Sequence, residues 1–293
     1  MKKKSLRLTN DETYYYIERG TSNEVLILIH GNMSSGVHFK PLIELLETEY
    51  KIIAPDLRGF GDSSYNVAIN SLEDLSDDIY LLMEELNIEK AHILGWSTGG
   101  AIAMKFAAKY KEMCEKLILV ESASFRGYPV FKKNELGQPI IGETYSTKEE
   151  LALDAVQVLP IITALRNNDV ATMKSIWDIV IYNVNNPSLE DDKLYLSETM
   201  KQRNLVDIDW CLTSFNMSNY SNGVSEGDDS IKDVRAKTLS LWGDSDIVVL
   251  ESMIDETVNA LSDAKKIILE NSGHSPMVDC PEELAKLISE FIE

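Results

Sequence analysis

A serine set among glycines is the feature of this sequence best suited to chemistry. Ser97 lies in Gly95-Trp96-Ser97-Thr98-Gly99, the Gly-x-Ser-x-Gly pattern of a nucleophile elbow, in which a strand turns sharply into a helix. Gly95 and Gly99 leave room where a Cβ would collide. Residues 91–94 are typical of a buried strand and residues 101–109 of a helix. The pattern predicts that Ser97 projects from the turn, with the positive end of the helix directed at its hydroxyl.

A serine nucleophile needs a base and an orienting acid, and the C-terminal part of the chain offers both. His274 lies in Asn271-Ser272-Gly273-His274-Ser275-Pro276, a tight loop after a predicted strand. Asp246 follows Gly243 at the end of another strand, beside an apolar run that would bury it. Asp244 also qualifies as the acid, although a role in shaping the turn suits it better. The order Ser97, Asp246, His274 is the order that this motif class requires, so we predict these three as a catalytic triad.

The loop after the first buried strand is the natural second wall of such a site. Residues 25–29 are a continuous apolar run that ends in His30-Gly31-Asn32. If Ser97 attacks a carbonyl, two backbone amides must hold the oxyanion, and we expect these to be the amides of Asn32 and Thr98. His30 is expected to brace the loop, because a better-placed base lies near the C-terminus.

Strands and helices are expected to alternate along most of the chain. This alternation predicts an α/β fold with a mostly parallel sheet covered on both faces. The loop at 55–63 is expected to be shaped by a network between Asp56 and Arg58. Strands are predicted at 5–8, 13–18, 25–29, 51–54, 91–94, 116–120, 237–242 and 265–270, and helices at 39–47, 72–86, 101–109 and 281–292.

The alternation lapses in the middle of the chain, which predicts a mainly helical cap over the sheet edge that carries Ser97. The expected division is residues 1–124 for the first part of the core, 125–235 for the cap and 236–293 for the second part of the core. Residues 128–131 and 137–139 are predicted as loops, and 151–165 and 170–184 as helices. A cap supplies a substrate pocket and excludes water from it. The candidate substrate-binding side chains are Met33, Trp96 and Phe131.

Composition excludes some partners. The 293 residues carry a formal net charge of −20, which repels nucleic acid and anionic membrane surfaces. No apolar run approaches the length of a membrane span. The three cysteines are scattered and show no metal-ligand spacing, which fits a reducing cytoplasm. We therefore expect a cytoplasmic protein that needs no metal or cofactor, does not bind nucleic acid and does not span a membrane.

These motifs together resemble those of the α/β-hydrolase superfamily. The resemblance implies the α/β-hydrolase fold: a mostly parallel central sheet flanked by helices, with an inserted mainly helical cap. Serine at position 97 separates the chain from members with an aspartate nucleophile, the haloalkane dehalogenases and epoxide hydrolases. The elbow at 95–100 and the cap segments 126–133 and 222–227 are similar to those of bacterial intracellular short-chain-length polyhydroxyalkanoate depolymerases. Thr98 departs from the methionine expected in that group, and its side chain leaves substrate size open.

The resemblance implies cleavage of poly-3-hydroxybutyrate, or its oligomers, into 3-hydroxybutyrate units. The substrate would be a small ester or a polyester, and a polymer granule is a possible surface partner. The residues alone indicate only a serine hydrolase. A general carboxylesterase or lactonase for small soluble esters remains an alternative. A non-catalytic ligand receptor on the same fold is another, since a fold does not fix a function.

Overall fold

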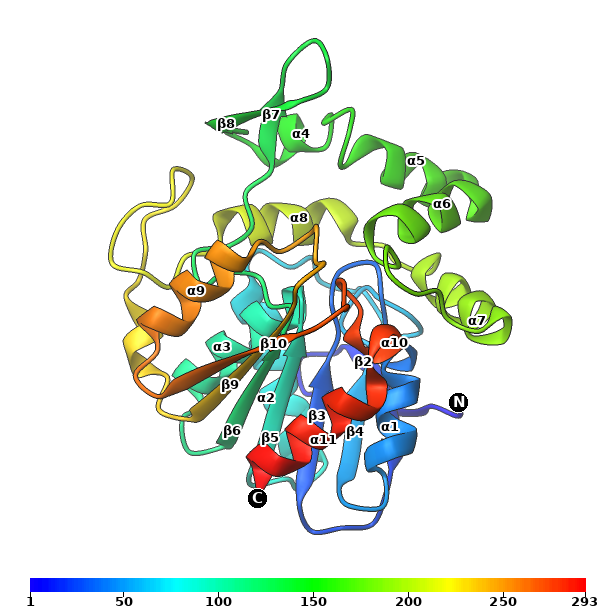
Figure 1. The fold of residues 1–293 in the computed structure, drawn as a ribbon, viewed down its shortest axis with the longest axis vertical. Helices are drawn as coiled ribbons and strands as arrows, with labels where there is room; N and C mark the ends of the chain where they lie inside the picture. The colour runs from blue at the N-terminus through cyan, green and yellow to red at the C-terminus, as the bar shows by residue number, and fades with distance from the viewer.

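An eight-stranded sheet forms the centre of the molecule (Figure 1). The structure is a computed structural model that describes all residues, Met1–Glu293. The strand order is β1-β2-β4-β3-β5-β6-β9-β10; the two ladders that β2 forms are antiparallel and the others are parallel. The strands are β1 (Lys4–Arg7), β2 (Thr13–Arg19), β3 (Val25–Ile29), β4 (Lys51–Pro55), β5 (Ala91–Trp96), β6 (Cys114–Val120), β9 (Lys237–Gly243) and β10 (Ala264–Leu269).

Helices cover both faces of this sheet, which explains the unbroken apolar runs in its central strands. In β3, Ile27 and Ile29 pack into one core while Leu26 and Leu28 pack into the other, because successive side chains of a strand point to opposite faces. Helices α2 and α3 contribute to the first core, and α1 and α11 to the second. The helices of the core are α1 (Lys40–Leu46), α2 (Leu72–Glu85), α3 (Thr98–Lys109), α9 (Glu251–Ala260), α10 (Pro276–Asp279) and α11 (Pro281–Ile292), with a 3₁₀ turn at Gly36–Phe39.

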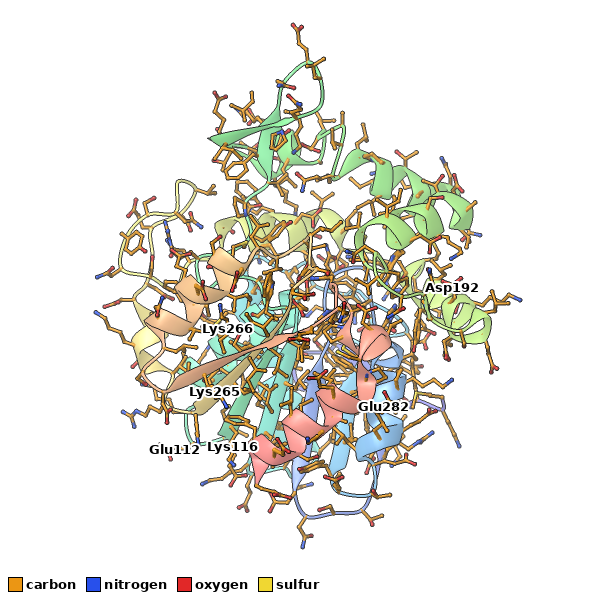
Figure 2. All side chains as sticks on the ribbon, in the orientation of Figure 1. Glu112, Lys116, Asp192, Lys265, Lys266 and Glu282 are labelled. Atoms are coloured by element: carbon orange, nitrogen blue, oxygen red, sulfur yellow. The ribbon has the colours of Figure 1, made fainter.

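The eight predicted strands and the four predicted helices of the core are all present, with ends within a few residues of those expected. Helix α9, between β9 and β10, was not predicted. The C-terminal helix α11 is fixed at its end by Lys116 of β6. The ammonium of Lys116 donates to the carbonyl of Phe291 at 2.6 Å and to that of Ile292, and a cation is favourable at this end of a helix dipole. Lys116 lies close to the chain terminus in Figure 2.

The elements between β6 and β9 lie over one end of the sheet (Figure 1). They are mainly helical, as expected. They begin with a two-stranded hairpin where loops were predicted. The division at residues 125 and 235 stays a prediction. The single helix expected at 151–165 is also wrong. Residues 152–158 are turns and irregular chain, because the Asp154 side chain accepts hydrogen bonds from the amides of Val156 and Gln157 and turns the chain. These elements are β7 (Phe131–Lys133), β8 (Pro139–Thr144), α4 (Lys148–Leu151), α5 (Leu159–Asn167), α6 (Val170–Val180), α7 (Leu189–Thr199), α8 (Leu205–Ser214) and a 3₁₀ turn at Ser230–Asp233.

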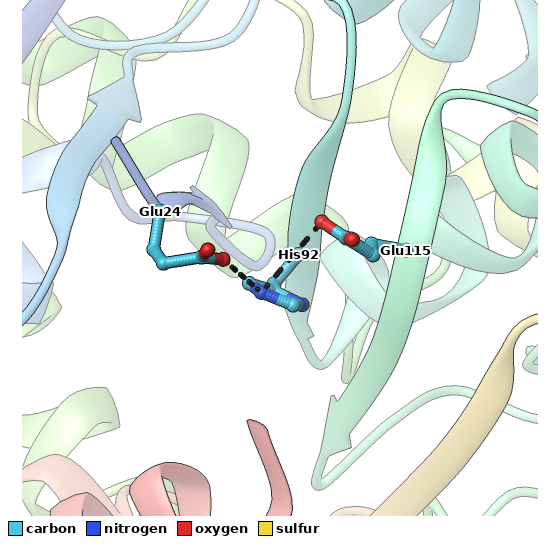
Figure 3. Close-up of side chains that lie close together, drawn as sticks. All are labelled: Glu24, His92 and Glu115. Atoms are coloured by element: carbon cyan, nitrogen blue, oxygen red, sulfur yellow. Dashed lines mark hydrogen bonds and ion pairs between the residues drawn. The ribbon is translucent and has the colours of Figure 1, made fainter. Parts of the chain in front are cut away.

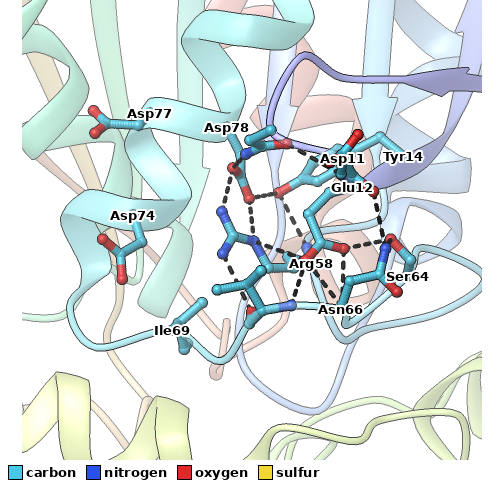
Figure 4. Close-up of polar contacts among 12 residues, drawn as sticks. Asp11, Glu12, Tyr14, Arg58, Ser64, Asn66, Ile69, Asp74, Asp77 and Asp78 are labelled. Carbon is cyan, nitrogen blue, oxygen red and sulfur yellow. Dashed lines mark hydrogen bonds and ion pairs between the residues drawn. The ribbon is translucent and has the colours of Figure 1, made fainter.

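The expected network between Asp56 and Arg58 is wrong, because each side chain binds a distant partner. Arg58 forms a two-pronged contact with the buried carboxylate of Asp78 on α2, and Tyr14 donates to the same carboxylate at 2.7 Å (Figure 4). Asp56 instead binds the ammonium of Lys3 at 2.6 Å and accepts from the amide of Gly36 at 3.0 Å. Strand β4 ends at Pro55 and the chain turns at residues 58 and 59, so the two side chains do not share a strand face and each meets a different element.

None of the helices combines the length and the apolar character that crossing a membrane requires.

Candidate active site

The turn at Ser97 has the strained geometry of a nucleophile elbow. Ser97 has φ 56° and ψ −121° between the end of β5 and the start of α3, a region that side chains rarely occupy. A Cβ on Gly95 would lie 2.2 Å from the carbonyl oxygen of Gly99, and one on Gly99 would lie 2.1 Å from that of Ile29. Glycine is therefore required at both positions for the helix to approach β5 and β3, and the serine is held at the carboxyl edge of the sheet.

The structure brings Ser97, His274 and Asp246 into one hydrogen-bonded chain. The Nε2 atom of His274 lies 3.0 Å from the Oγ atom of Ser97, and its Nδ1 atom lies 2.8 Å from the Oδ2 atom of Asp246. The loop that carries the histidine is fixed by Trp96, whose indole N–H donates to the carbonyl of His274 at 2.8 Å. Hydroxyl, imidazole and carboxylate have the mutual arrangement that activates a serine nucleophile.

Asp246 rather than Asp244 contacts the histidine. Asp244 is exposed, and its carboxylate accepts only from the neighbouring Ser245 hydroxyl. The second oxygen of Asp246 accepts from the amides of Val248 and Val249 at 2.7 and 3.1 Å. Burial acts to raise the pKa of Asp246, but the charge of His274 and these hydrogen bonds outweigh it and leave the pKa lowered. The carboxylate is thus ionised at neutral pH and able to stabilise an imidazolium.

Asn32 and Thr98 lie beside Ser97, where an oxyanion would form. The amide N–H of Asn32 donates to no group in the protein, and the amide of Thr98 belongs to the first, unpaired turn of α3. The Asn32 side chain is occupied elsewhere, since its Nδ2 donates to Asp209 at 2.9 Å and its Oδ1 accepts from Gln202 at 2.8 Å. Only backbone donors are therefore free at this position.

The hydrogen-bonded chain opens into a cavity of about 500 Å³ between the sheet edge and the cap. Seventeen of its 24 lining residues are hydrophobic, which suits an apolar substrate. Met33 and Trp96 line it, as predicted from the sequence. Phe131 does not, because the chain enters strand β7 at that residue and leaves its neighbour Val130 at the cavity wall.

Glu121 is a buried acid of this site that the sequence interpretation missed. It follows the last residue of β6, is 0 % exposed and has φ 45°. One of its oxygens accepts from the amide of Gly243 at 2.7 Å, and the other has no partner. Carboxylate oxygens of Glu121 and Asp246 lie within 4.8 Å of each other. The signal was available: an acid directly after a buried strand that pairs with β9 shares the sheet edge that carries Asp246.

Glu121→Gln is expected to change how stability depends on pH. Burial and the charge of Asp246 raise the pKa of Glu121 well above its ordinary value of 4.5. Above pH 4.5 folding therefore makes Glu121 take up a proton, and the contribution of Glu121 to the free energy of unfolding falls as the pH rises. Glutamine is neutral at every pH, and its amide oxygen can still accept from the amide of Gly243. The free energy of unfolding of the variant, relative to the wild type, should increase from about pH 5 to about pH 8.

Urea denaturation at several pH values measures this difference. Glu112→Gln is the matched control, since Glu112 is exposed and forms no ion pair, as its place at the rim of Figure 2 illustrates; it should show no trend. An equal response of both variants to pH would contradict the protonated state of Glu121.

Three groups of acids and histidines are close enough together to hold a cation. Lys3 occupies the first, with its ammonium bound to Asp56, Asp62 and Glu198. The second is Glu121 with Asp246 and His274, where the histidine is already hydrogen-bonded to Asp246 and Ser97. In the third, His92 lies 3.3 Å from Glu24 and 3.9 Å from Glu115, at the opposite edge of the sheet (Figure 3). In each group, hydrogen bonds or ion pairs within the protein already hold side chains of the group.

His30 has the bracing role that was expected. It is fully buried, and its Nε2 atom accepts from the amide of Leu57 at 3.0 Å. Burial lowers its pKa to about 3, so the ring is neutral and joins the loop after β3 to the loop after β4.

Known proteins with similar sequences or folds include lipases and an esterase. Lipase 1 of Psychrobacter immobilis is 26% identical over 285 residues, which cover 96% of this chain and 81% of the lipase. Lipase 3 of Moraxella sp. (strain TA144) is also 26% identical, over 96% of this chain and 82% of its own length. An esterase from Exiguobacterium antarcticum shares the fold with a TM-score of 0.76 at 18% identity, covering 98% of both chains. The putative lipase of Acinetobacter baumannii AYE has a TM-score of 0.75 at 24% identity, covering 99% of this chain and 90% of its own.

A family model described as the alpha/beta hydrolase fold matches residues 24–281, which include the elbow, the loop of Asn32 and both partners of Ser97. The chain belongs to the α/β-hydrolase fold family.

Proposed function

We propose that the protein hydrolyses carboxylic esters through an acyl-enzyme on Ser97. The observation that carries this proposal is the hydrogen-bonded chain Ser97–His274–Asp246 at the base of an apolar cavity. The lipases and the esterase to which the chain is similar support the same reaction class.

The proposed mechanism uses only side chains and backbone of this chain. His274 takes the proton of Ser97 as the oxygen attacks the ester carbonyl, while Asp246 fixes the tautomer of the ring. The amides of Asn32 and Thr98 hold the oxyanion, where each donor contributes roughly 3 kcal/mol to lowering the barrier. His274 then gives its proton to the departing alcohol. Water hydrolyses the acyl-enzyme by the same steps, which restores the serine.

Within this class, we propose that the natural substrate is poly-3-hydroxybutyrate or its oligomers, in the cytoplasm. The support is the likeness of residues 126–133 and 222–227 to segments of intracellular depolymerases. These two segments touch, since the Nδ2 atom of Asn222 donates to the carbonyl of Arg126 at 3.0 Å, and Tyr128 and Val130 of the first segment line the cavity. A neutral polyester also needs no charged partner, which suits a chain of net charge −20.

The lipase and esterase relatives favour a second candidate, a general esterase for small esters. An assay of purified protein compares release of 3-hydroxybutyrate from amorphous polymer granules with turnover of p-nitrophenyl butyrate, with Ser97→Ala as the blank. Release of monomer from granules is the expected result. Turnover of the small ester with no release from granules would leave the general esterase as the function. If neither is turned over and ligands still bind, a non-catalytic receptor becomes the better interpretation.

A further inference from the structure

The cavity contains one carboxylate that the proposed mechanism does not use. Asp209 lies on cap helix α8 and lines the cavity together with Asn32, Ser97 and His274. Its Oδ1 atom accepts from the Asn32 side chain at 2.9 Å, and no group of the protein donates to its Oδ2 atom. A carboxylate oxygen without a partner in a mostly apolar cavity requires a donor from water or from a ligand.

Asp209 lies near the position that the reacting carbonyl would occupy, because both are next to Asn32. Asn32 supplies a free backbone amide beside Ser97 and, with its side chain, contacts Asp209. A substrate group that binds the free oxygen of Asp209 is therefore close to the ester carbonyl oxygen that the amide of Asn32 would hold. The two groups would be a few atoms apart along the substrate.

We propose that Asp209 accepts a hydrogen bond from a hydroxyl group on the acyl part of the substrate, a few atoms from the ester carbonyl. This inference rests on the proposed ester hydrolysis and specifies its substrate class as hydroxyacyl esters. In a 3-hydroxyalkanoate polyester only the terminal unit has a free hydroxyl on its acyl part. Transfer of that unit to Ser97 releases one monomer at a time from the hydroxyl end.

A hydroxyl fits this position better than an ammonium group does. Removal from bulk water raises the pKa of Asp209 to about 7, despite the hydrogen bond from Asn32, and the charge of Asp154 adds to the rise. At neutral pH the carboxyl is thus partly protonated. A hydroxyl can hydrogen-bond to both forms, whereas an ammonium gains a charge partner only from the ionised form and loses its hydration in an apolar cavity.

The test compares methyl 3-hydroxybutyrate with methyl butyrate, which differ by the hydroxyl alone. The wild type should show a kcat/KM roughly tenfold higher for the hydroxylated ester, the effect of one hydrogen bond to a carboxylate. Asp209→Leu should bring the ratio of the two values close to one. Asp209→Asn keeps an acceptor for the Asn32 side chain and so protects the fold and the oxyanion site; it should lower the ratio several-fold.

The ratio separates specificity from positioning. If Asp209 acts only by holding Asn32, both esters lose activity equally in Asp209→Leu and the ratio does not change, which overturns the inference. Gln157→Leu, which removes another polar residue of the cavity, is the matched control and should keep the wild-type ratio. Collapse of the ratio in Gln157→Leu but not in the Asp209 variants would also overturn it. A wild type that hydrolyses neither ester contradicts the proposed function, whereas equal turnover of both contradicts the role of Asp209 alone.

Discussion

Ser97→Ala is expected to lower kcat for p-nitrophenyl butyrate by about 10⁶-fold, the loss that follows removal of the nucleophile from a serine triad. Without the hydroxyl no acyl-enzyme forms, and His274 has no proton to take. The oxyanion site and the cavity remain, so a residual rate of about 10³-fold over water should persist. Steady-state hydrolysis measured at high enzyme concentration quantifies both values.

Ser76→Ala is the matched control for this prediction. Ser76 is also a buried serine, but it lies on α2, its hydroxyl has no hydrogen-bond partner, and it does not line the cavity. It should keep wild-type kcat. Thermal unfolding of both variants checks that the fold is intact, since alanine at 97 retains the strained backbone. Full activity in a folded Ser97→Ala protein would refute the acyl-enzyme mechanism.

The sequence was most informative where local pattern and fold topology coincide. Residues 25–29 and 117–120 are apolar without interruption, and 91–94 are apolar apart from His92, because their strands are covered on both faces and lie in the centre of the sheet. The ends of parallel strands share one edge of the sheet, so loops that follow strands meet there regardless of their separation in sequence. The same rule predicts that Asn32, Ser97 and His274 lie at one edge of the sheet.

The sequence pattern does not predict which side chains of different elements contact each other. The sequence predicts a network between Arg58 and its neighbour Asp56, whereas the partner of Arg58 is Asp78, 20 residues away on α2. The helix expected at 151–165 is interrupted because Asp154 binds local amides, which propensity does not indicate. Phe131 is predicted to bind substrate, but the chain enters strand β7 at that residue and Val130 lines the cavity instead. Nothing in the sequence marks Asp209, since its role depends on how α8 lies over the sheet.

Asp78→Ala is expected to lower the free energy of unfolding by about 3–5 kcal/mol, the usual cost of removing one partner of a buried ion pair. The Asp78 carboxylate is fully buried and accepts from Arg58, Tyr14 and Asn10. Its removal leaves the Arg58 guanidinium, itself only 8% exposed, without its main partner. This contact joins the loop after β4 to the middle of α2 (Figure 4).

The neighbouring Asp77 offers a matched control for this stability prediction. Its side chain is 40% exposed and contacts Lys109 at 2.7 Å, and an exposed pair of this kind contributes about 0–1 kcal/mol. Lys109 also keeps Glu73 as a partner in Asp77→Ala. Urea denaturation should therefore give a much lower midpoint for Asp78→Ala than for Asp77→Ala. Equal losses would mean that the Arg58 contact does not stabilise the fold. The attraction between the two charges would then be offset by the cost of removing both of them from water.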